Sequence, residues 1–353
     1  MKKLLISLSM LLVLFSCKKE NNDTPTTDTP TALEENSPYT YLYVLNEGSW
    51  GVNNASLDRI DLQTGQIEND IFAKTNGHNL GDVANDMILY GSKLYIVVNN
   101  SNTVEIVDAQ TAKSVKQIAL TNKQPRYVFP YNGSVYVSCY SDEIVEIDTL
   151  TYTITRTCNV GKDPEGLVVV NNKLFVCNSG GLDYPNYDSS ISIVEMTNFQ
   201  EEKKLTVGLN PSKIASIAND KLLVLCNGNY GNVPSFLSLI DLQSQSVTKL
   251  TYSCSNFVVF NNYAYCYDYD WTTHQAITFK VNLSTLEKES LLLNGIAAIV
   301  SPYHIAVNPS NGNIYISDSQ NFTNSGDINC FSAAGSFLYK KECGIGTSKI
   351  VFW

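Results

Sequence analysis

The feature that most constrains the fold of this chain is a repeat of roughly 44 residues that runs through nearly all of the sequence. Each copy contains an apolar segment, an Asn-Gly-like turn, an alternating segment such as "LYIVVN", a loop, a segment that ends in Asp, and a polar segment after a Thr-rich turn. Three successive copies begin at Gln124, Asp163 and Asn210. Internal repetition at this period is typical of architectures in which neighbouring units bury a shared core.

The opening segment of the repeat recurs seven times, and each copy carries four short segments in which apolar and polar residues alternate. Such alternation predicts β-strands, and no window of the repeat region competes as an amphipathic helix. Four strands per repeat are typical of a β-propeller blade. The sequence therefore predicts an all-β fold, a seven-bladed β-propeller, with opening strands at 83–89, 126–131, 165–170, 212–217, 255–260, 303–307 and 348–353.

The two ends of the repeat region predict how the ring closes. Residues 348–353 form an opening strand that no further strand follows, whereas residues 40–77 supply three strands that lack an opening one. Together they make one complete blade. We therefore expect the C-terminal strand to pair with the N-terminal three and to lock the ring.

The N-terminus has the pattern of a bacterial lipoprotein signal peptide, with two lysines, an apolar run over 4–15 and then Ser16-Cys17. The apolar run is too short to span a bilayer as a mature helix. Its "LFSC" ending resembles a lipobox, which implies that Cys17 is lipidated; the alternative is an ordinary signal peptide that contains a cysteine. Residues 18–38 are polar and rich in Thr and Pro, as expected of a flexible tether, and residues 39–353 form the propeller.

Composition narrows the possible partners and the role of the cysteines. The net charge of −10 and the pI near 4.8 argue against nucleic acid, because few cations are present to neutralise phosphates. Eight cysteines remain beyond Cys17. Several follow apolar strand segments at similar places in the repeat, so we interpret them as small buried residues. Disulfides between them stay open at this point, with no pairing assigned.

Three stretches of the repeat region resemble the YncE-type family of seven-bladed propellers, and within it a branch of Bacteroidota lipoproteins. They read "YVLNEGSWGVNNASLDRID", "NGHNLGDVANDMILYGSKLYIVVNNSNTVEIVD" and "SPYHIAVNPSNGNIYISDSQNFTNSGDI". The resemblance covers nearly all of residues 39–353 and implies the propeller fold. Some members of the branch, the BtuG-type proteins, capture cobalamin at the cell surface for a TonB-dependent transporter. The resemblance therefore implies a corrinoid as one possible ligand, and it assigns no contact residues.

Long loops between the second and third strands distinguish one face of the predicted ring. They occupy 46–55, 177–190, 226–236, 267–275 and 317–327 in blades one, four, five, six and seven. Long loops on a rigid scaffold usually carry function, and aromatic residues among Asn and Gly form an adaptable contact surface. The alternative is that these loops only pack on one another as a cap. The aromatic residues in these loops that we take as candidates are Trp50, Tyr184, Tyr187, Tyr230, Tyr269, Trp271 and Phe322.

Polar residues are expected on the same face, around the mouth of the central channel. All three histidines fall there, and imidazole is a common ligand of metals, haem and cobalt; we favour the interpretation that they are ordinary loop residues. Charged residues near the opening strands are Asp82, Asp86, Arg126, Glu165, Lys213 and Lys349. The candidate ligand-binding residues are the seven aromatic residues named above together with Asn53, His78, Arg126, Asp268, His274, Tyr303 and His304.

No catalytic or cofactor-binding motif is evident in the sequence, so we predict a binding protein that is not an enzyme and holds no cofactor. The expected function is capture of a bulky nutrient, with cobalamin or another corrinoid as the best candidate, for transfer to a TonB-dependent transporter. The expected location is the outer membrane, on its surface or periplasmic face, with the lipid as the only membrane contact. The alternatives are a protein–protein interaction scaffold of the cell envelope and, third, a propeller enzyme of the lactonase or lyase type.

Overall fold

The computed structural model describes residues 33, 37–218, 220–270 and 272–353. The predicted signal peptide, the lipidation site Cys17 and most of the predicted tether lie outside these residues, as does Trp271. Among the described residues, no helix has the length and hydropathy needed to cross a membrane.

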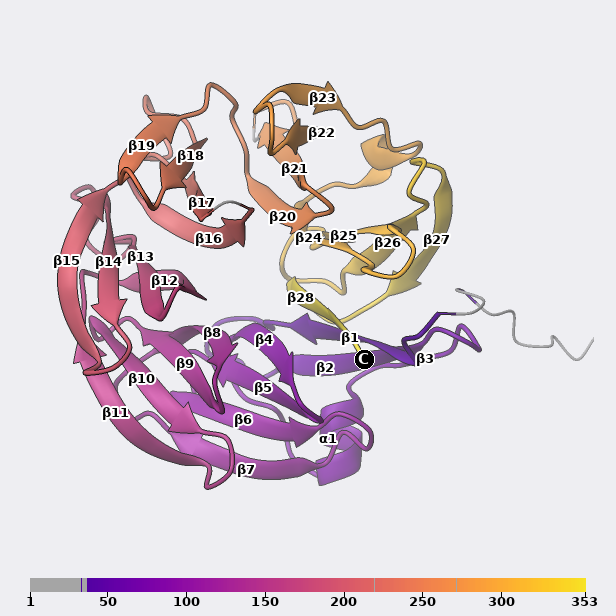
Figure 1. Cartoon of the computed structure of the whole chain (residues 1–353). Helices are drawn as coiled ribbons and strands as arrows, with labels where there is room; N and C mark the ends of the chain where they lie inside the picture. Colours follow the sequence, from indigo (N-terminus) through magenta and orange to yellow (C-terminus); the bar gives the residue numbers. More distant parts are fainter. Residues whose placement is uncertain (1–32, 34–36, 219, 271) are drawn as a thin grey trace, which may run out of the picture.

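The chain folds into seven four-stranded antiparallel sheets arranged as the blades of a ring (Figure 1). Blade one consists of β28 (Thr347–Phe352), β1 (Tyr41–Asn46), β2 (Ser56–Asp61) and β3 (Ile67–Glu68). Blade two consists of β4 (Ala84–Tyr90), β5 (Lys93–Val98), β6 (Thr103–Asp108) and β7 (Ser114–Ala119). Blade three consists of β8 (Pro125–Tyr131), β9 (Ser134–Cys139), β10 (Glu143–Asp148) and β11 (Thr153–Asn159).

The remaining four blades repeat the same order. Blade four consists of β12 (Pro164–Val170), β13 (Lys173–Asn178), β14 (Ser190–Glu195) and β15 (Gln200–Thr206). Blade five consists of β16 (Pro211–Ile217), β17 (Lys221–Cys226), β18 (Phe236–Asp241) and β19 (Ser246–Lys249). Blade six consists of β20 (Asn256–Phe260), β21 (Tyr263–Asp270), β22 (Gln275–Asn282) and β23 (Lys288–Ser290). Blade seven consists of β24 (Pro302–Val307), β25 (Ile314–Asp318), β26 (Asp327–Phe331) and β27 (Phe337–Glu342) and follows the short 3₁₀ helix η1 (Ile296–Ala298).

The prediction that the C-terminal strand closes the ring is confirmed. β28 pairs antiparallel with β1 from Leu42↔Phe352 to Asn46↔Thr347. The hydroxyl of Thr347 also donates to Oδ1 of Asn46 at 2.9 Å. The predicted opening strands match the inner strands of the seven blades to within about one residue at most ends, which is the usual uncertainty of strand bounds.

The fourth strand of blade one departs from the prediction of an all-strand repeat. β3 has only two residues, and the segment that follows forms the helix α1 (Ile71–Asn76). Asp70 caps this helix by accepting from the amide of Ala73. Ile71 and Phe72 are buried in the apolar cluster between blades one and two. The helix thus adds two apolar side chains to the cluster between blades one and two.

The apolar core is divided among the interfaces between neighbouring blades. The cluster between blades one and two, for example, joins Tyr43 and Leu45 to Leu94 and Ile96. The eight cysteines of the described residues are all buried, which confirms their interpretation as small core residues. Alternation along each strand therefore places one face of every sheet against the preceding blade and the other against the following blade.

Candidate functional site

The seven inner strands enclose a central channel with a cavity of about 410 Å³. Its lining changes character along the axis. The end near the starts of the inner strands is charged and polar, whereas apolar side chains such as Ile88, Phe129 and Val168 follow further along the strands. Antiparallel order places the starts of the inner strands on the same face as the long loops. The charged end is therefore the channel mouth of the long-loop face.

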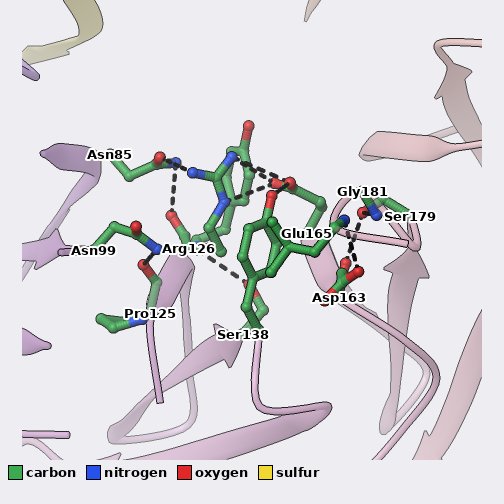
Figure 2. A network of polar contacts seen from close by, with 12 residues as sticks. Asn85, Asn99, Pro125, Arg126, Ser138, Asp163, Glu165, Ser179 and Gly181 are labelled. Carbon is green, nitrogen blue, oxygen red and sulfur yellow. Dashed lines mark hydrogen bonds and ion pairs between the residues drawn. The ribbon is translucent and has the colours of Figure 1, made fainter. Parts of the chain in front are cut away.

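A polar network fixes one side of this mouth, as Figure 2 shows. The guanidinium of Arg126 forms an ion pair with Glu165, with Nη2 at 3.1 Å from Oε1. Arg126 also donates to the side-chain oxygen of Asn85, and the amide of Asn85 donates back to the Arg126 carbonyl at 3.0 Å. The hydroxyl of Tyr140 donates to Glu165, and the Tyr140 ring lies 4.7 Å from the guanidinium carbon. Arg126 is thus occupied by protein partners and orders the mouth.

A second group joins blade one to blade seven across the mouth. The hydroxyl of Tyr303 donates to the Glu47 carboxyl at 3.1 and 3.2 Å, and the ring of Phe322 packs edge-on against Tyr303 at 5.2 Å. Loss of solvent raises the pKa of Glu47 to about 7, although the charge of Arg126 and the Tyr303 hydrogen bond act in the opposite direction. Glu47 therefore changes its charge near neutral pH.

The third group consists of the lysines of the mouth and His304. Lys349 forms an ion pair with Asp86 at 2.7 Å. Loss of solvent, and then repulsion by Lys349, lowers the pKa of Lys213 to about 7. Burial, and then the charges of the two lysines, hold the pKa of His304 well below its usual range, so its imidazole is neutral at pH 7.

Replacing Glu47 by Gln is expected to flatten the pH dependence of stability between about pH 4.5 and 7. In this window the folded protein retains the Glu47 proton that the unfolded chain releases, so the stabilisation is complete below pH 4.5 and is lost as the pH rises through 7. The decrease in the free energy of unfolding across this pH window should be smaller in Glu47→Gln than in the wild type by roughly 2–3 kcal/mol. Urea unfolding at several pH values measures it. The exposed variant Glu287→Gln is the control and should keep the wild-type fall; an equal fall in both variants would contradict the prediction.

Aromatic side chains lie on the long loops of the face that carries the mouth. Tyr184 and Tyr187 from blade four and Tyr230 from blade five form a continuous row, here called the aromatic ledge, with ring centroids 6.0 and 6.1 Å apart. Tyr230 is 74% exposed. Loss of solvent at the hydroxyl nevertheless raises the pKa of Tyr230, and the Glu165 carboxylate adds to this, although hydrogen bonds with Asn210 and Asn227 act in the opposite direction.

The long loops are ordered by their own polar contacts rather than by mutual packing alone. In blade four, Asp163 accepts from the amide of Leu182 at 2.9 Å and its carbonyl accepts from the hydroxyl of Ser179 (Figure 2). In blade one, Asp82 accepts from the amide of Gly51 at 3.0 and 3.1 Å, next to Trp50, whose side chain is 69% exposed. Such anchoring presents rigid, accessible rings, as a contact surface requires.

Blade six differs from the predicted long loop. β21 continues through Asp268 and Tyr269 to Asp270, where the carboxylate accepts from the amides of Thr272 and Thr273 and closes a tight turn. Tyr269 is buried in the cluster between blades six and seven, and its hydroxyl donates to the carbonyl of Val300 at 2.5 Å. The prediction that residues 267–275 form a long loop was therefore wrong, because local turn chemistry extends the hairpin.

The three histidines have separate surroundings. His78 follows α1, is exposed and packs edge-on against Phe72 at 5.3 Å. His274 lies in the blade-six turn, with Nδ1 at 3.1 Å from the Tyr269 hydroxyl. Only His304 lines the channel. Within the described residues, no group of three or more His, Cys, Asp and Glu side chains is arranged to hold a metal ion.

The candidate residues within the described part of the chain thus fall into four groups. Arg126, Tyr303, His304 and Phe322 lie at or beside the mouth, and Trp50, Asn53, Tyr184, Tyr187 and Tyr230 lie on the long loops around it. Asp268, Tyr269 and His274 belong to the blade-six hairpin, and His78 lies apart beside α1.

Four residues of the mouth were missed by the sequence interpretation, namely Glu47, Asn85, Tyr140 and Asn256. Their positions within the repeat could have identified them. Glu47 and Tyr140 directly follow the second strands of blades one and three, and Asn85 and Asn256 begin or nearly begin inner strands. Superimposing the repeats position by position would have placed all four at the end of the channel where the inner strands begin.

Comparison with known proteins supports the architecture. The family model described as "Domain of unknown function (DUF5074)" matches residues 41–118, which span most of blades one and two. No curated protein matches the chain. A quinonprotein alcohol dehydrogenase-like protein from Bacteroides thetaiotaomicron has a TM-score of 0.65 at 16% identity, covering 89% of this chain and 78% of that one.

Two other solved structures share the fold. Hydrazine synthase from Kuenenia stuttgartiensis has a TM-score of 0.61 at 15% identity, covering 75% of this chain and 88% of that one. A streptogramin B lyase has a TM-score of 0.56 at 10% identity, covering 75% of this chain and 83% of that one. These similarities support the fold alone. Each of the three has an enzyme name, or a name that likens it to an enzyme, and at 10–16% identity these names say nothing about the activity of this chain. The resemblance to YncE-type and BtuG-type proteins stays a prediction.

Proposed function

We propose that the protein is a non-catalytic binding protein that captures a bulky organic ligand on its long-loop face, with cobalamin or another corrinoid as the best candidate. The observation that carries this proposal is the aromatic ledge and Trp50, exposed beside a charged channel mouth. Aromatic rings cover the flat apolar faces of a ligand, and the polar mouth offers partners to its amide and hydroxyl groups. A corrinoid has both kinds of surface.

The size of the channel supports capture at the mouth rather than inside the ring. The cavity of about 410 Å³ is far smaller than a corrinoid, so it accommodates one projecting group of such a ligand. The rest of the ligand would lie on the loops of blades one, four and five. This arrangement leaves the outer side of the ligand accessible to a partner protein.

We further propose that a lipid on Cys17 anchors the protein in the outer membrane, on either face, and that the ligand passes to a TonB-dependent transporter. The path of the chain supports this orientation. The amide of Leu33 donates to the carbonyl of Leu62 at 3.0 Å, at the end of β2 that lies opposite the long loops. The chain also enters β1 on that side. An anchor there would direct the long-loop face away from the membrane.

Titration of the purified protein with cyanocobalamin, monitored by calorimetry, tests the proposal. Haem and a siderophore serve as parallel titrants. We expect stoichiometric binding with a dissociation constant of about 1 µM or below, and a loss of at least about tenfold in Tyr230→Ala or Trp50→Ala, because exposed aromatic anchors usually carry much of the binding energy. Leu150→Ala is the matched control, since Leu150 is 87% exposed but lies in the β10–β11 turn on the opposite face.

The outcomes separate the candidate functions. Binding that is lost in the Tyr230 and Trp50 variants but kept in Leu150→Ala supports capture on the long-loop face. Binding that all three variants retain would overturn the assignment of the face. Heat from none of the three ligands would overturn the corrinoid assignment and favour the protein–protein scaffold, because the same exposed rings suit a protein partner.

A further inference from the structure

The charges of the channel mouth are unevenly compensated. Arg126 and Lys349 each have a carboxylate partner, at 3.1 and 2.7 Å respectively. Lys213 differs, because its Nζ donates to the neutral side-chain oxygen of Asn256 at 2.7 Å. Among the described residues, no carboxylate lies within ion-pair distance of Lys213 Nζ.

The surroundings of Lys213 hold its ammonium group in the channel. Asn256 is fixed by a second hydrogen bond, from its Nδ2 to the carbonyl of Tyr303 at 3.1 Å, so its oxygen stays directed at Lys213. The ring of Phe257 lies 5.4 Å from Nζ. His304 and Lys349 line the same part of the cavity. Two lysines and a neutral imidazole thus line the same cavity, and Asp86 is paired with Lys349 rather than with Lys213.

This arrangement has the properties of an anion site. A cation taken out of bulk water without a counter-charge is costly, and an anion that reaches it offsets that cost. The lowered pKa of Lys213 reports the same cost, since loss of solvent and the neighbouring Lys349 both disfavour the ammonium. The neutral imidazole of His304 and the amide of Asn256 can donate hydrogen bonds to oxygen atoms of an anion.

We propose that Lys213 is the centre of an anion-binding subsite, completed by Asn256, His304 and Lys349, which takes one carboxylate or phosphate-ester group of the captured ligand. The inference deepens the proposed capture function and rests on it. The volume of the cavity accommodates such a group while the bulk of the ligand stays on the loops. A corrinoid carries a phosphodiester in its nucleotide loop, which has this chemistry.

Free oxyanions test the subsite without assuming the identity of the ligand. The purified protein is titrated with sulfate and with dimethyl phosphate at about pH 6, below the pKa of Lys213, and lysine side-chain NMR signals are followed. We expect saturable binding that weakens at least about tenfold in Lys213→Met and at most about threefold in Lys213→Arg, which keeps the charge. Lys113→Met, an exposed lysine in the β6–β7 turn on the opposite face, should bind like the wild type.

A parallel titration with cyanocobalamin separates failure of the subsite from failure of the proposed function. Oxyanion binding that depends on Lys213, without cobalamin binding, supports the subsite and overturns the corrinoid assignment. Cobalamin binding that is unchanged in Lys213→Met overturns the subsite and leaves the capture function standing. Oxyanion binding of equal strength in wild type, Lys213→Met and Lys113→Met also overturns the subsite.

Discussion

A chain that ends at Gly346, without β28, is expected to lose its cooperative unfolding transition. β28 is the inner strand of blade one, and it buries Thr347 and Ile350 against the blades on either side. Loss of each large buried side chain costs about 2–5 kcal/mol. The exposed edge of β1 adds unpaired backbone groups. Because a domain of ordinary stability has only about 5–15 kcal/mol in total, the open ring should not persist. Near-UV circular dichroism and urea unfolding measure the loss.

A smaller change and a rescue separate ring closure from a general effect of truncation. Trp353→Ala keeps β28 but removes the stack of Trp353 on Tyr41, whose centroids lie 5.4 Å apart, and should cost only about 1 kcal/mol. A synthetic peptide of residues 345–353 added to the truncated chain should restore the near-UV signal by pairing with β1. An unaltered urea midpoint in the truncated chain would show that β28 does not hold the ring.

The fold was largely predictable from the sequence because each propeller blade corresponds to one copy of a repeat with a regular length. Alternation within strands and turn residues between them recur at the same place in each copy, so errors in one copy are corrected by the others. Blade one shows where this reasoning stops. The segment after Glu68 repeats the polar composition of a fourth strand, yet Asp70 caps α1 and Phe72 enters the core. A local cap and one buried ring decided between strand and helix, and neither has a periodic signal.

The candidate site was predictable only in outline. Long loops identified the correct face, and position in the repeat identified Arg126, Glu165 and Lys213 as residues near the channel. The hydrogen bonds and ion pairs of these residues depend on side chains from separate blades. Arg126, for example, contacts Asn85 of blade two and Glu165 of blade four. Contacts between residues some forty positions apart leave no trace in one sequence. The blade-six hairpin was predicted wrongly for a different reason. The hydrogen bonds from the amides of Thr272 and Thr273 to Asp270 are local, and they make a tight turn where the aromatic composition suggested a loop.

Replacing Arg126 by Met is expected to destabilise the protein by about 3–5 kcal/mol. The carboxylate of Glu165 has a side-chain exposure of 8%, and the substitution leaves it buried with the Tyr140 hydroxyl as its remaining partner. A buried charge that loses its counter-charge bears the full cost of its desolvation. Urea unfolding at pH 7 measures the loss. The double variant Arg126→Met/Glu165→Gln removes both charges and should recover most of the stability, with a coupling energy of roughly 1–3 kcal/mol.

An exposed ion pair on the same face provides the control for this prediction. Lys162 and Asp183 lie 2.5 Å apart with side-chain exposures of 60% and 42%, so Lys162→Met should leave the urea midpoint close to that of the wild type. If Arg126→Met changes the urea midpoint as little as Lys162→Met does, the mouth is well hydrated and Arg126 is free to bind a ligand. A large loss that the double variant reverses would instead identify Arg126 as a residue that orders the mouth. We would then expect the aromatic ledge, Trp50 and Lys213 to contact the ligand directly. The rings of Trp50, Tyr184 and Tyr230 are exposed, and the Lys213 ammonium donates to a neutral side chain.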